Sequence, residues 1–337
     1  MKCCNRFGRR IVMTLLSSAF LALGAQTLQA QEKYPNRPIK VIVPYAPGGA
    51  TDIVARIIGD EVQKITGQGF VVINKPGANG ILAIDELAKS PPDGYTLMLG
   101  NVSTNTITPI IYAHKMPLDY RKSIVAVTRL VDVPAFLLVT AANGFPPKTV
   151  KDFISYAKAN AGRMHYGTVG VGSYTHYDMA YFFKRAGDVN VMSLPNKNGA
   201  SGVIQDLLRG DAQAAFLNVA STGPQVQAGK LRALAVVNHG RLPDYPDIPT
   251  MKEAGFEDVG TVAWQALFAP AGTPTAAMEA VFHAVKMALE RPETIEKFKA
   301  QYFNIVPNKS LADADRWLAD EMAHWEKITT EVKIEMQ

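Results

Sequence analysis

Two glycine-containing turns carry residue types suited to holding an anion. The first turn follows an apolar segment and leads into a predicted helix. Such a turn presents free backbone N–H groups, and glycine removes the Cβ atom that would keep a ligand away. The sequence therefore predicts an anion-binding turn, with a plain surface loop as the alternative, and either Thr51 or Asp52 can cap the helix. The candidate ligand-binding residues of this turn are Tyr45, Ala46, Gly48, Gly49, Thr51 and Asp52.

The second turn also connects a short predicted strand to a predicted helix. Its candidate ligand-binding residues are Gly170, Gly172, Ser173 and His176. The glycine spacing is not G-x-G-x-x-G and no Gly-Lys-Ser/Thr follows, so a nucleotide-binding loop is excluded. Ser173 and His176 could pair as nucleophile and base, but no G-x-S-x-G elbow surrounds the serine and no acidic partner is identified. A helix cap or a ligand donor is the favoured role of Ser173.

Three asparagines extend the candidate site. Asn196 and Asn198 lie in a third strand-to-helix turn, where a capped core helix is the alternative to a ligand contact. Asn218 follows the apolar run 212–217, and polar side chains at strand ends are common in α/β ligand sites. The six histidines are scattered without metal-binding spacing, so the sequence predicts no metal site.

Residues 1–30 read as a signal peptide, with a basic start, an apolar run too short to span a bilayer and a small residue at the end. Removing its four basic residues from the 35 in the chain leaves 31 against 30 acidic residues, a net charge of +1. The overall basic balance is therefore no argument for nucleic-acid binding. Cys3 and Cys4 also lie in this segment, so the mature chain is expected to lack thiol chemistry and to be periplasmic.

Short apolar strands alternate with amphipathic helices, which predicts α/β layers with largely parallel sheets. Expected strands are 39–44, 70–74, 96–100, 135–139, 165–167, 191–194, 212–217 and 231–236. Expected helices are 51–66, 79–89, 149–160, 173–186, 200–209, 275–290, 292–300 and 310–331. Two extended runs, 125–139 and 262–268, look like crossovers between lobes. On that interpretation residues 31–132 plus 265–337 form one lobe and 133–264 the other; a single larger sheet is the alternative.

Motifs in a shared order along nearly the whole mature chain point to one family. The chain resembles the Bug-type extracytoplasmic solute receptors, the substrate-binding proteins of tripartite tricarboxylate transporters. The matching segments are 34–39, 43–56, 74–80, 92–97, 170–176, 206–210, 246–250 and 268–274.

This resemblance implies a periplasmic-binding-protein type II-like Venus flytrap of two α/β lobes joined by two crossover segments. It also implies a monomer with no cofactor and no catalysis, whose two glycine turns grip the carboxylate of a small organic acid. The partners would be the membrane subunits of the transporter. Docking on a sensor kinase ectodomain and, less favoured, an exported hydrolase are the alternative functions.

The chain departs from the usual family pattern in three places. It reads Pro195-Asn196-Lys197-Asn198 where relatives usually have Pro-Tyr-Lys-Gly, and Asn218 where many have an acidic residue. The segment 238–243 also differs. These changes fall where the far half of the ligand would be bound, and the missing carboxylate favours a ligand whose far end is neutral or anionic.

Overall fold

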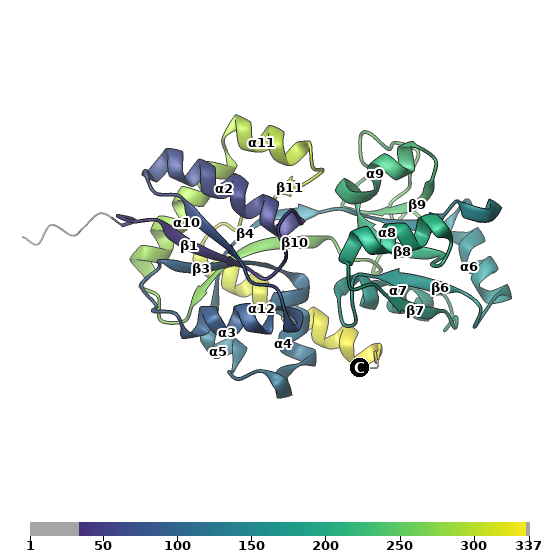
Figure 1. Cartoon of the computed structure of the whole chain (residues 1–337), viewed down its shortest axis with the longest axis horizontal. Helices are drawn as coiled ribbons and strands as arrows, with labels where there is room; N and C mark the ends of the chain where they lie inside the picture. The colour runs from purple at the N-terminus through teal and green to yellow at the C-terminus, as the bar shows by residue number, and fades with distance from the viewer. Residues whose placement is uncertain (1–33, 335–337) are drawn as a thin grey trace, which may run out of the picture.

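The structure, a computed structural model, describes residues 34–334. The chain forms two α/β lobes connected by extended strands, as Figure 1 shows. The predicted signal peptide, residues 1–30, lies outside the described residues. We refer to the lobe built on the six-stranded sheet as the larger lobe and to the lobe built on the five-stranded sheet as the smaller lobe.

The sheet of the larger lobe has the strand order β11-β4-β10-β3-β1-β2. β1, β2 and β3 are mutually parallel, whereas β10 runs antiparallel to both β3 and β4. In Figure 1, α2 and α11 lie above this sheet and α3, α4 and α12 lie below it. Its strands are β1 (Ile39–Val43), β2 (Phe70–Asn74), β3 (Thr96–Asn101), β4 (Ile124–Val133), β10 (Ala263–Pro270) and β11 (Asn304–Ile305).

The sheet of the smaller lobe has the order β7-β6-β8-β5-β9. β6 is parallel to β7 and β8, and β5 is antiparallel to β8 and β9. Its strands are β5 (Ala135–Thr140), β6 (His165–Thr168), β7 (Met192–Pro195), β8 (Ala214–Asn218) and β9 (Leu231–Val237). The prediction of largely parallel sheets is thus right for the strands that lead into the glycine turns and wrong for β4, β5, β9, β10 and β11.

The helices follow the predicted ranges to within two residues wherever a helix was expected. The expected helices are α2 (Ala50–Thr66), α3 (Ile81–Lys89), α6 (Val150–Ala159), α7 (Tyr174–Arg185), α8 (Gly199–Arg209), α10 (Thr275–Leu289), α11 (Pro292–Lys299) and α12 (Leu311–Glu331). Three helices were not expected, namely α4 (Thr108–Ile111), α5 (Tyr120–Ser123) and α9 (Val219–Gln227).

The two lobes are joined where extended strands pass from one sheet to the other. β4 belongs to the larger sheet and β5 to the smaller one, with Pro134 between them. The chain returns after β9 through residues 238–262 and enters β10 of the larger sheet. Both extended runs expected from the sequence therefore connect the two sheets, and the division of the chain at residues 132 and 264 stays a prediction.

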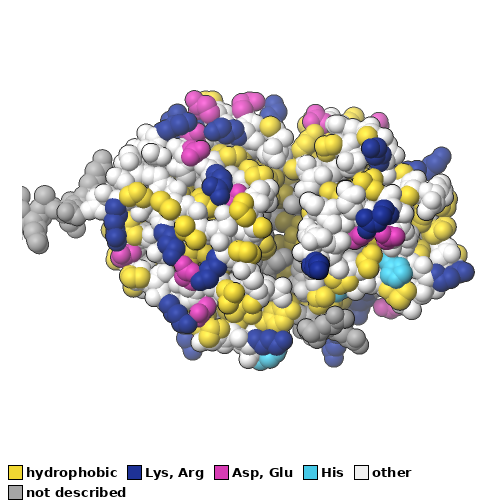
Figure 2. All heavy atoms as spheres, in the orientation of Figure 1, with side chains coloured by type: hydrophobic (Ala, Val, Ile, Leu, Met, Phe, Trp, Pro, Cys, Tyr) yellow, Lys and Arg dark blue, Asp and Glu magenta, His cyan; other side chains and the backbone are white. Residues whose placement is uncertain are grey.

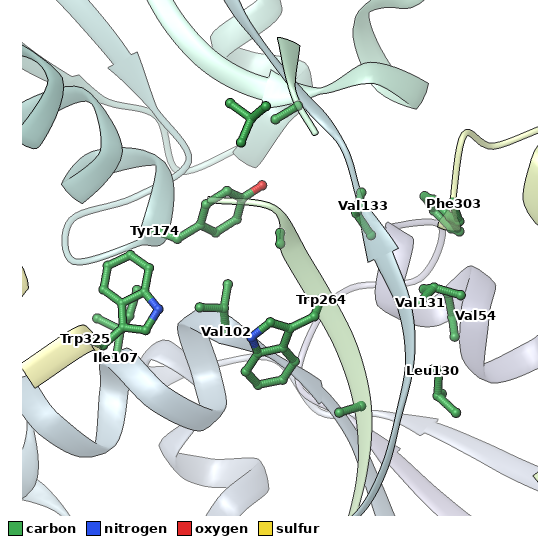
Figure 3. Close-up of a cluster of buried hydrophobic side chains, with 14 of the residues drawn as sticks. Val54, Val102, Ile107, Leu130, Val131, Val133, Tyr174, Trp264, Phe303 and Trp325 are labelled. Carbon is green, nitrogen blue, oxygen red and sulfur yellow. The ribbon is translucent and has the colours of Figure 1, made fainter. Parts of the chain in front are cut away.

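Buried aromatic side chains fill the junction between the lobes (Figure 3). Trp264 on β10 is 1% exposed, and its indole Nε1 donates a hydrogen bond to Glu321 Oε2 of α12 at 2.8 Å. Trp325, also on α12, meets Tyr177 of α7 edge-on with ring centroids 5.9 Å apart. Helix α12 of the larger lobe thereby packs against α7, the helix that begins at the second glycine turn.

This packing predicts that Trp325→Ala lowers the free energy of unfolding by about 3–5 kcal/mol, since it leaves a cavity at the junction. Urea unfolding followed by far-ultraviolet circular dichroism measures the change. Asp320→Ala, at an exposed position of the same helix, is the control and should change stability by less than about 0.5 kcal/mol. Equal effects of the two substitutions would contradict the assignment of Trp325 to the core.

Candidate functional site

A cleft of about 610 Å³ separates the lobes, and both glycine turns line it. Figure 2 shows the groove between the lobes in the space-filling view. From the first turn Tyr45 and Ala46 face the cleft. From the second turn Gly170, Gly172 and Ser173 face it, and Asn198 lines it from the third turn. The turns that the sequence singled out are therefore brought together from opposite lobes.

The first turn is fixed by the carboxylate of Asp52, which is 3% exposed. Asp52 accepts hydrogen bonds from the Gly48 N–H at 2.9 Å and from the Arg56 guanidinium at 2.9 and 3.0 Å. Asn74 Nδ2 donates to Asp52 at 2.9 Å and to the Tyr45 carbonyl at 3.0 Å. Asp52 is thus fully engaged in shaping the turn, and its contact with a ligand stays a prediction.

Helix α2 begins one residue earlier than predicted. Its N-cap is Gly49, not Thr51 or Asp52, and the first helical hydrogen bond runs from Ile53 N–H to the Gly49 carbonyl. The N–H groups of the first turn of a helix have no partner within the helix, so those of α2 remain available as donors. Thr51 is buried and its hydroxyl donates to Gln265 Oε1 of β10 at 2.8 Å, which ties the helix start to the second crossover.

Tyr45 stands beside polar groups of the larger lobe. Its hydroxyl donates to Asn101 Oδ1 at 2.7 Å and lies 2.6 Å from Thr104 Oγ1. Burial raises the pKa of Tyr45 to about 12 even though both hydrogen bonds lower it, so the phenol is neutral at pH 7.

The second turn is held by hydroxyl groups that converge on one carbonyl. Thr168 Oγ1 and Ser173 Oγ each donate to the Gly170 oxygen at 2.8 Å. Ser173 is the N-cap of α7, as predicted, but its side chain accepts no capping hydrogen bond. Gly170 and Gly172 adopt φ values of 143° and 76°, a region that favours glycine.

His176 is buried, and the Gly172 N–H donates to its Nδ1 at 3.4 Å. Burial lowers the pKa of His176 to about 4, so the ring is neutral at pH 7. The imidazole therefore supports the turn from within the smaller lobe. Ser173 and His176 each bond to the backbone of the turn, which is not the arrangement of a nucleophile and its base.

Tyr174, the first residue of α7, connects the two lobes. Its N–H donates to Ser103 Oγ of the larger lobe at 3.2 Å. Its hydroxyl donates to Asn218 Oδ1 at the end of β8 at 2.9 Å. Asn218 thus orients a tyrosine at the mouth of the cleft, and a direct contact between Asn218 and a ligand stays a prediction.

The third turn presents a cation to the cleft. Asn196 Nδ2 donates to Asp206 at 2.7 Å and Asn196 Oδ1 accepts from the Asn198 N–H at 2.9 Å, so both ends of its amide serve the turn. Asn198 is the N-cap of α8 without a side-chain capping bond. Lys197 is exposed and lines the cleft. It is the one charged side chain among the described residues of the lining.

Several lining residues were not expected from the sequence. The larger lobe contributes residues 76–80, Asn101, Ser103 and Thr108, and the smaller lobe adds Tyr174 and Lys197. The rule that polar residues at strand ends face ligands would have found Asn101 at the end of β3. Conversely, the cleft lining does not include Gly48, Gly49, Thr51, Asp52, His176, Asn196 or Asn218, which lie around the turns, and their direct contact with a ligand stays a prediction.

The cleft is therefore suited to an anion. Helices α2, α7 and α8 all begin at turns that line it, and backbone N–H groups at helix starts favour negative charge. Within residues 34–334 no group of three or more His, Cys, Asp or Glu could hold a metal ion. Nor does any helix of this part have the length and apolar character needed to cross a membrane.

Comparison with known proteins identifies the family. The model of the tripartite tricarboxylate transporter family receptor, TctC, matches residues 54–334. The chain belongs to this family. Protein BugT of Bordetella pertussis is 32% identical over 89% of this chain and 90% of its own length.

Solved structures agree with this family assignment. Rpa4515 of R. palustris, solved with adipate, has a TM-score of 0.80 and 30% identity over 89% of this chain and 99% of its own. MatC from Rhodopseudomonas palustris, solved with bound malate, has a TM-score of 0.76 and 28% identity, covering 88% and 99%. The two-lobed α/β fold expected from the resemblance to solute receptors is confirmed.

The Asp52 network makes a testable prediction about stability and pH. Burial alone would raise the pKa of Asp52, but the bonds from Arg56, Gly48 and Asn74 together lower it. A carboxyl with a lowered pKa in the folded chain stabilises it above its unfolded pKa, and this contribution is lost as pH falls through the folded pKa. Asp52→Asn should therefore cost about 2 kcal/mol at pH 7 and progressively less below about pH 4.

Urea unfolding of the wild type and of Asp52→Asn across this pH range measures the difference. The matched control is Asp93→Asn, which breaks an Asp–Arg pair whose side chains are 42% and 61% exposed. That substitution should cost less than about 1 kcal/mol at any pH. A cost for Asp52→Asn that stays constant from pH 7 to pH 3 would contradict the role of the ionised carboxylate.

Proposed function

We propose that this chain is a periplasmic receptor that captures a small organic acid between its lobes and delivers it to the membrane subunits of a tripartite tricarboxylate transporter. The observation that carries the proposal is the meeting of two helix-starting turns from opposite lobes in one cleft. Residues 1–30 would direct export, and the receptor would act as a monomer without catalysis.

The geometry suits a carboxylate for a physical reason. A carboxylate has two oxygens that together accept about four hydrogen bonds, and helix starts supply donors without a counter-charge of their own. The first turn offers the N–H groups at the start of α2, while the second turn offers the start of α7. Ordered water would complete the shell, since water bridges are nearly as favourable as direct bonds. The adipate and malate of the solved relatives are consistent with this class of ligand.

The far end of the ligand would meet the smaller lobe at Lys197 and Asn198. The cleft lining carries this one cation and no acidic side chain among its described residues, so a second anionic group is favoured over a cationic one. We therefore propose a dicarboxylate, or an acid with another anionic group, as the preferred ligand. Ligand binding would stabilise the closed form in proportion to its tighter interaction with that form.

A hydrolytic function has little support in this geometry. The Ser173 hydroxyl donates to the Gly170 carbonyl and His176 Nδ1 is occupied by the Gly172 N–H. A nucleophile needs a base within hydrogen-bond reach, and these two contacts hold both groups elsewhere. Docking on a sensor kinase stays a prediction that no observation favours over transport.

Gly49→Val tests the carboxylate site without threatening the fold. Gly49 has φ −79° and ψ 168°, and an added Cβ would meet only the Ala46 carbonyl at 3.9 Å. Valine adopts this extended conformation without strain but caps a helix less well than glycine, so the variant should stay folded with a loss of stability of about 1 kcal/mol or less. The side chain would nevertheless crowd the approach to the α2 start, and we expect at least about tenfold weaker binding, or 1.4 kcal/mol.

A thermal-shift screen of organic acids, beginning with adipate and malate, identifies the ligand. A ligand present at about 100 times its dissociation constant adds about 2.7 kcal/mol to the free energy of unfolding. Isothermal titration calorimetry then compares wild type and Gly49→Val. Unchanged affinity in the folded variant would rule out the proposed grip by the first turn.

Lys197→Gln tests the charge preference. We expect affinity for a dicarboxylate to fall about tenfold, while affinity for the monocarboxylate of equal length changes less than about threefold. Calorimetry with succinate and butyrate, or with the longer pair that the screen favours, measures the ratio. Lys230→Gln, at an exposed lysine outside the cleft lining, is the control and should change neither affinity. An equal loss of affinity for both acids would show that Lys197 does not bind a second carboxylate of the ligand.

A further inference from the structure

A second groove lies between the lobes, away from the ligand cleft. This back groove has a volume of about 680 Å³. The smaller lobe contributes Leu242 and Asp244 from the segment after β9, and the larger lobe contributes Ile295 and residues 302–305 around β11. The back groove therefore lies between the same two lobes as the cleft.

The order of strands places the two spaces on opposite sides of the crossover strands. The cleft is lined by residues that follow β1, β3, β6 and β7. The back groove lies at β11 and β9, the strands at the other edge of each sheet. In Figure 1, β11 and β9 lie above the crossovers and β6 and β7 lie below them. A rotation about β4, β5 and β10 that narrows the cleft therefore widens the back groove.

Contacts between the two lobes accompany the back groove. The ring of Tyr302 in the larger lobe lies 5.9 Å from the ring of Tyr245 in the smaller lobe, with an interplanar angle of 50°. Tyr302 thereby packs against the hydrophobic cluster of the smaller lobe. Asn304 Nδ2 of β11 donates a hydrogen bond to Asn238 Oδ1 at 3.0 Å. We call these two pairs the back contacts.

Each lobe holds its aromatic partner firmly. Tyr245 is 8% exposed, meets Phe136 of β5 edge-on at 5.1 Å, and occupies space that a Cβ on Gly223 would need. Tyr302 has φ 57°, a left-handed conformation that is rare for a bulky residue. Such strain persists where surrounding contacts impose it, and the ring of Tyr302 packs against Tyr245 of the other lobe. Since the partners are fixed, lobe rotation changes the distance between them directly.

We propose that the back contacts stabilise the arrangement with the wider cleft and so set how tightly the cleft binds its ligand. Closing the cleft separates Tyr302 from Tyr245 and Asn304 from Asn238. The measured dissociation constant equals the intrinsic constant divided by the fraction of molecules in the binding-competent state. Contacts that must break on closure therefore weaken binding from outside the site. This inference concerns regulation of the cleft and rests on the proposed function.

The sign of the expected effect makes the test sharp. Tyr302→Ala and Asn304→Ala should each bind the organic acid found in the screen about two- to tenfold more tightly than wild type. Asn238→Ala should also tighten binding, because it removes the same bond between the lobes together with a bond from Asn238 Nδ2 to the Gly240 carbonyl in its own segment. Tyr156→Ala is the control, since that ring packs on Phe145 within the smaller lobe at 5.0 Å and should leave affinity unchanged. Unchanged or weaker binding in the folded back-contact variants would overturn the proposal.

A second measurement separates failure of this inference from failure of the proposed function. Spin labels are attached at Lys89→Cys on α3 and Met192→Cys on β7, with Cys3 and Cys4 changed to serine. Pulsed electron paramagnetic resonance then measures the distance between the two labels in the absence of ligand. Tyr302→Ala and Asn304→Ala should shift this distance distribution toward shorter values. If no organic acid binds the wild type, the shift still tests the back contacts, and an unchanged distribution in both variants overturns them.

Discussion

The unpaired N–H groups at the starts of α2, α7 and α8 are the constraint around which this molecule is organised. A helix start has donors that its own backbone cannot satisfy, and leaving them buried without an acceptor is costly. Some N–H groups at these turns have acceptors within the protein. The Gly172 N–H donates to His176 Nδ1, and the Tyr174 N–H donates to Ser103 Oγ. The turns from which α2, α7 and α8 begin line the cleft between the lobes, so an anion bound by both glycine turns would also favour the approach of the lobes.

The same helix starts are linked to the second crossover. Thr51 at the start of α2 bonds to Gln265 of β10, and Asp178 on α7 accepts from the N–H and the hydroxyl of Thr261 at 3.0 and 2.6 Å. Burial raises the pKa of Asp178 to about 7 although both Thr261 bonds lower it. The helices that follow both glycine turns are therefore bonded to the second crossover, which joins the lobes. Under the proposed function, these short polar contacts would connect ligand binding with the position of the crossover.

Local pattern was enough to predict the strands and long helices, because apolar periodicity and glycine turns are encoded within a few residues. α9 was missed because Gly223-Pro224 reads as a turn, yet the helix runs through both. β11 has only two residues and exists through its pairing with β4. The cap of α2 was misassigned because Asp52 bonds to Arg56 of the same helix and to Asn74 at the end of β2, while Ser173 does cap α7 as predicted. Asn101 could have been found from its place at the end of β3, whereas the role of Ser103 depends on its bond to Tyr174 of the other lobe.

Recognition by backbone groups has a consequence for specificity. N–H groups at helix starts hold any carboxylate similarly, so they give affinity for a class of ligand and little discrimination within it. Under the proposed function, discrimination would come from side chains that contact the rest of the ligand. The smaller lobe lines the cleft with the side chains of Lys197, Asn198 and Tyr174, and Asn218 bonds to the tyrosine. Two of the sequence departures from the usual family pattern fall on this set. The fold and the carboxylate grip can thus stay constant while the ligand changes.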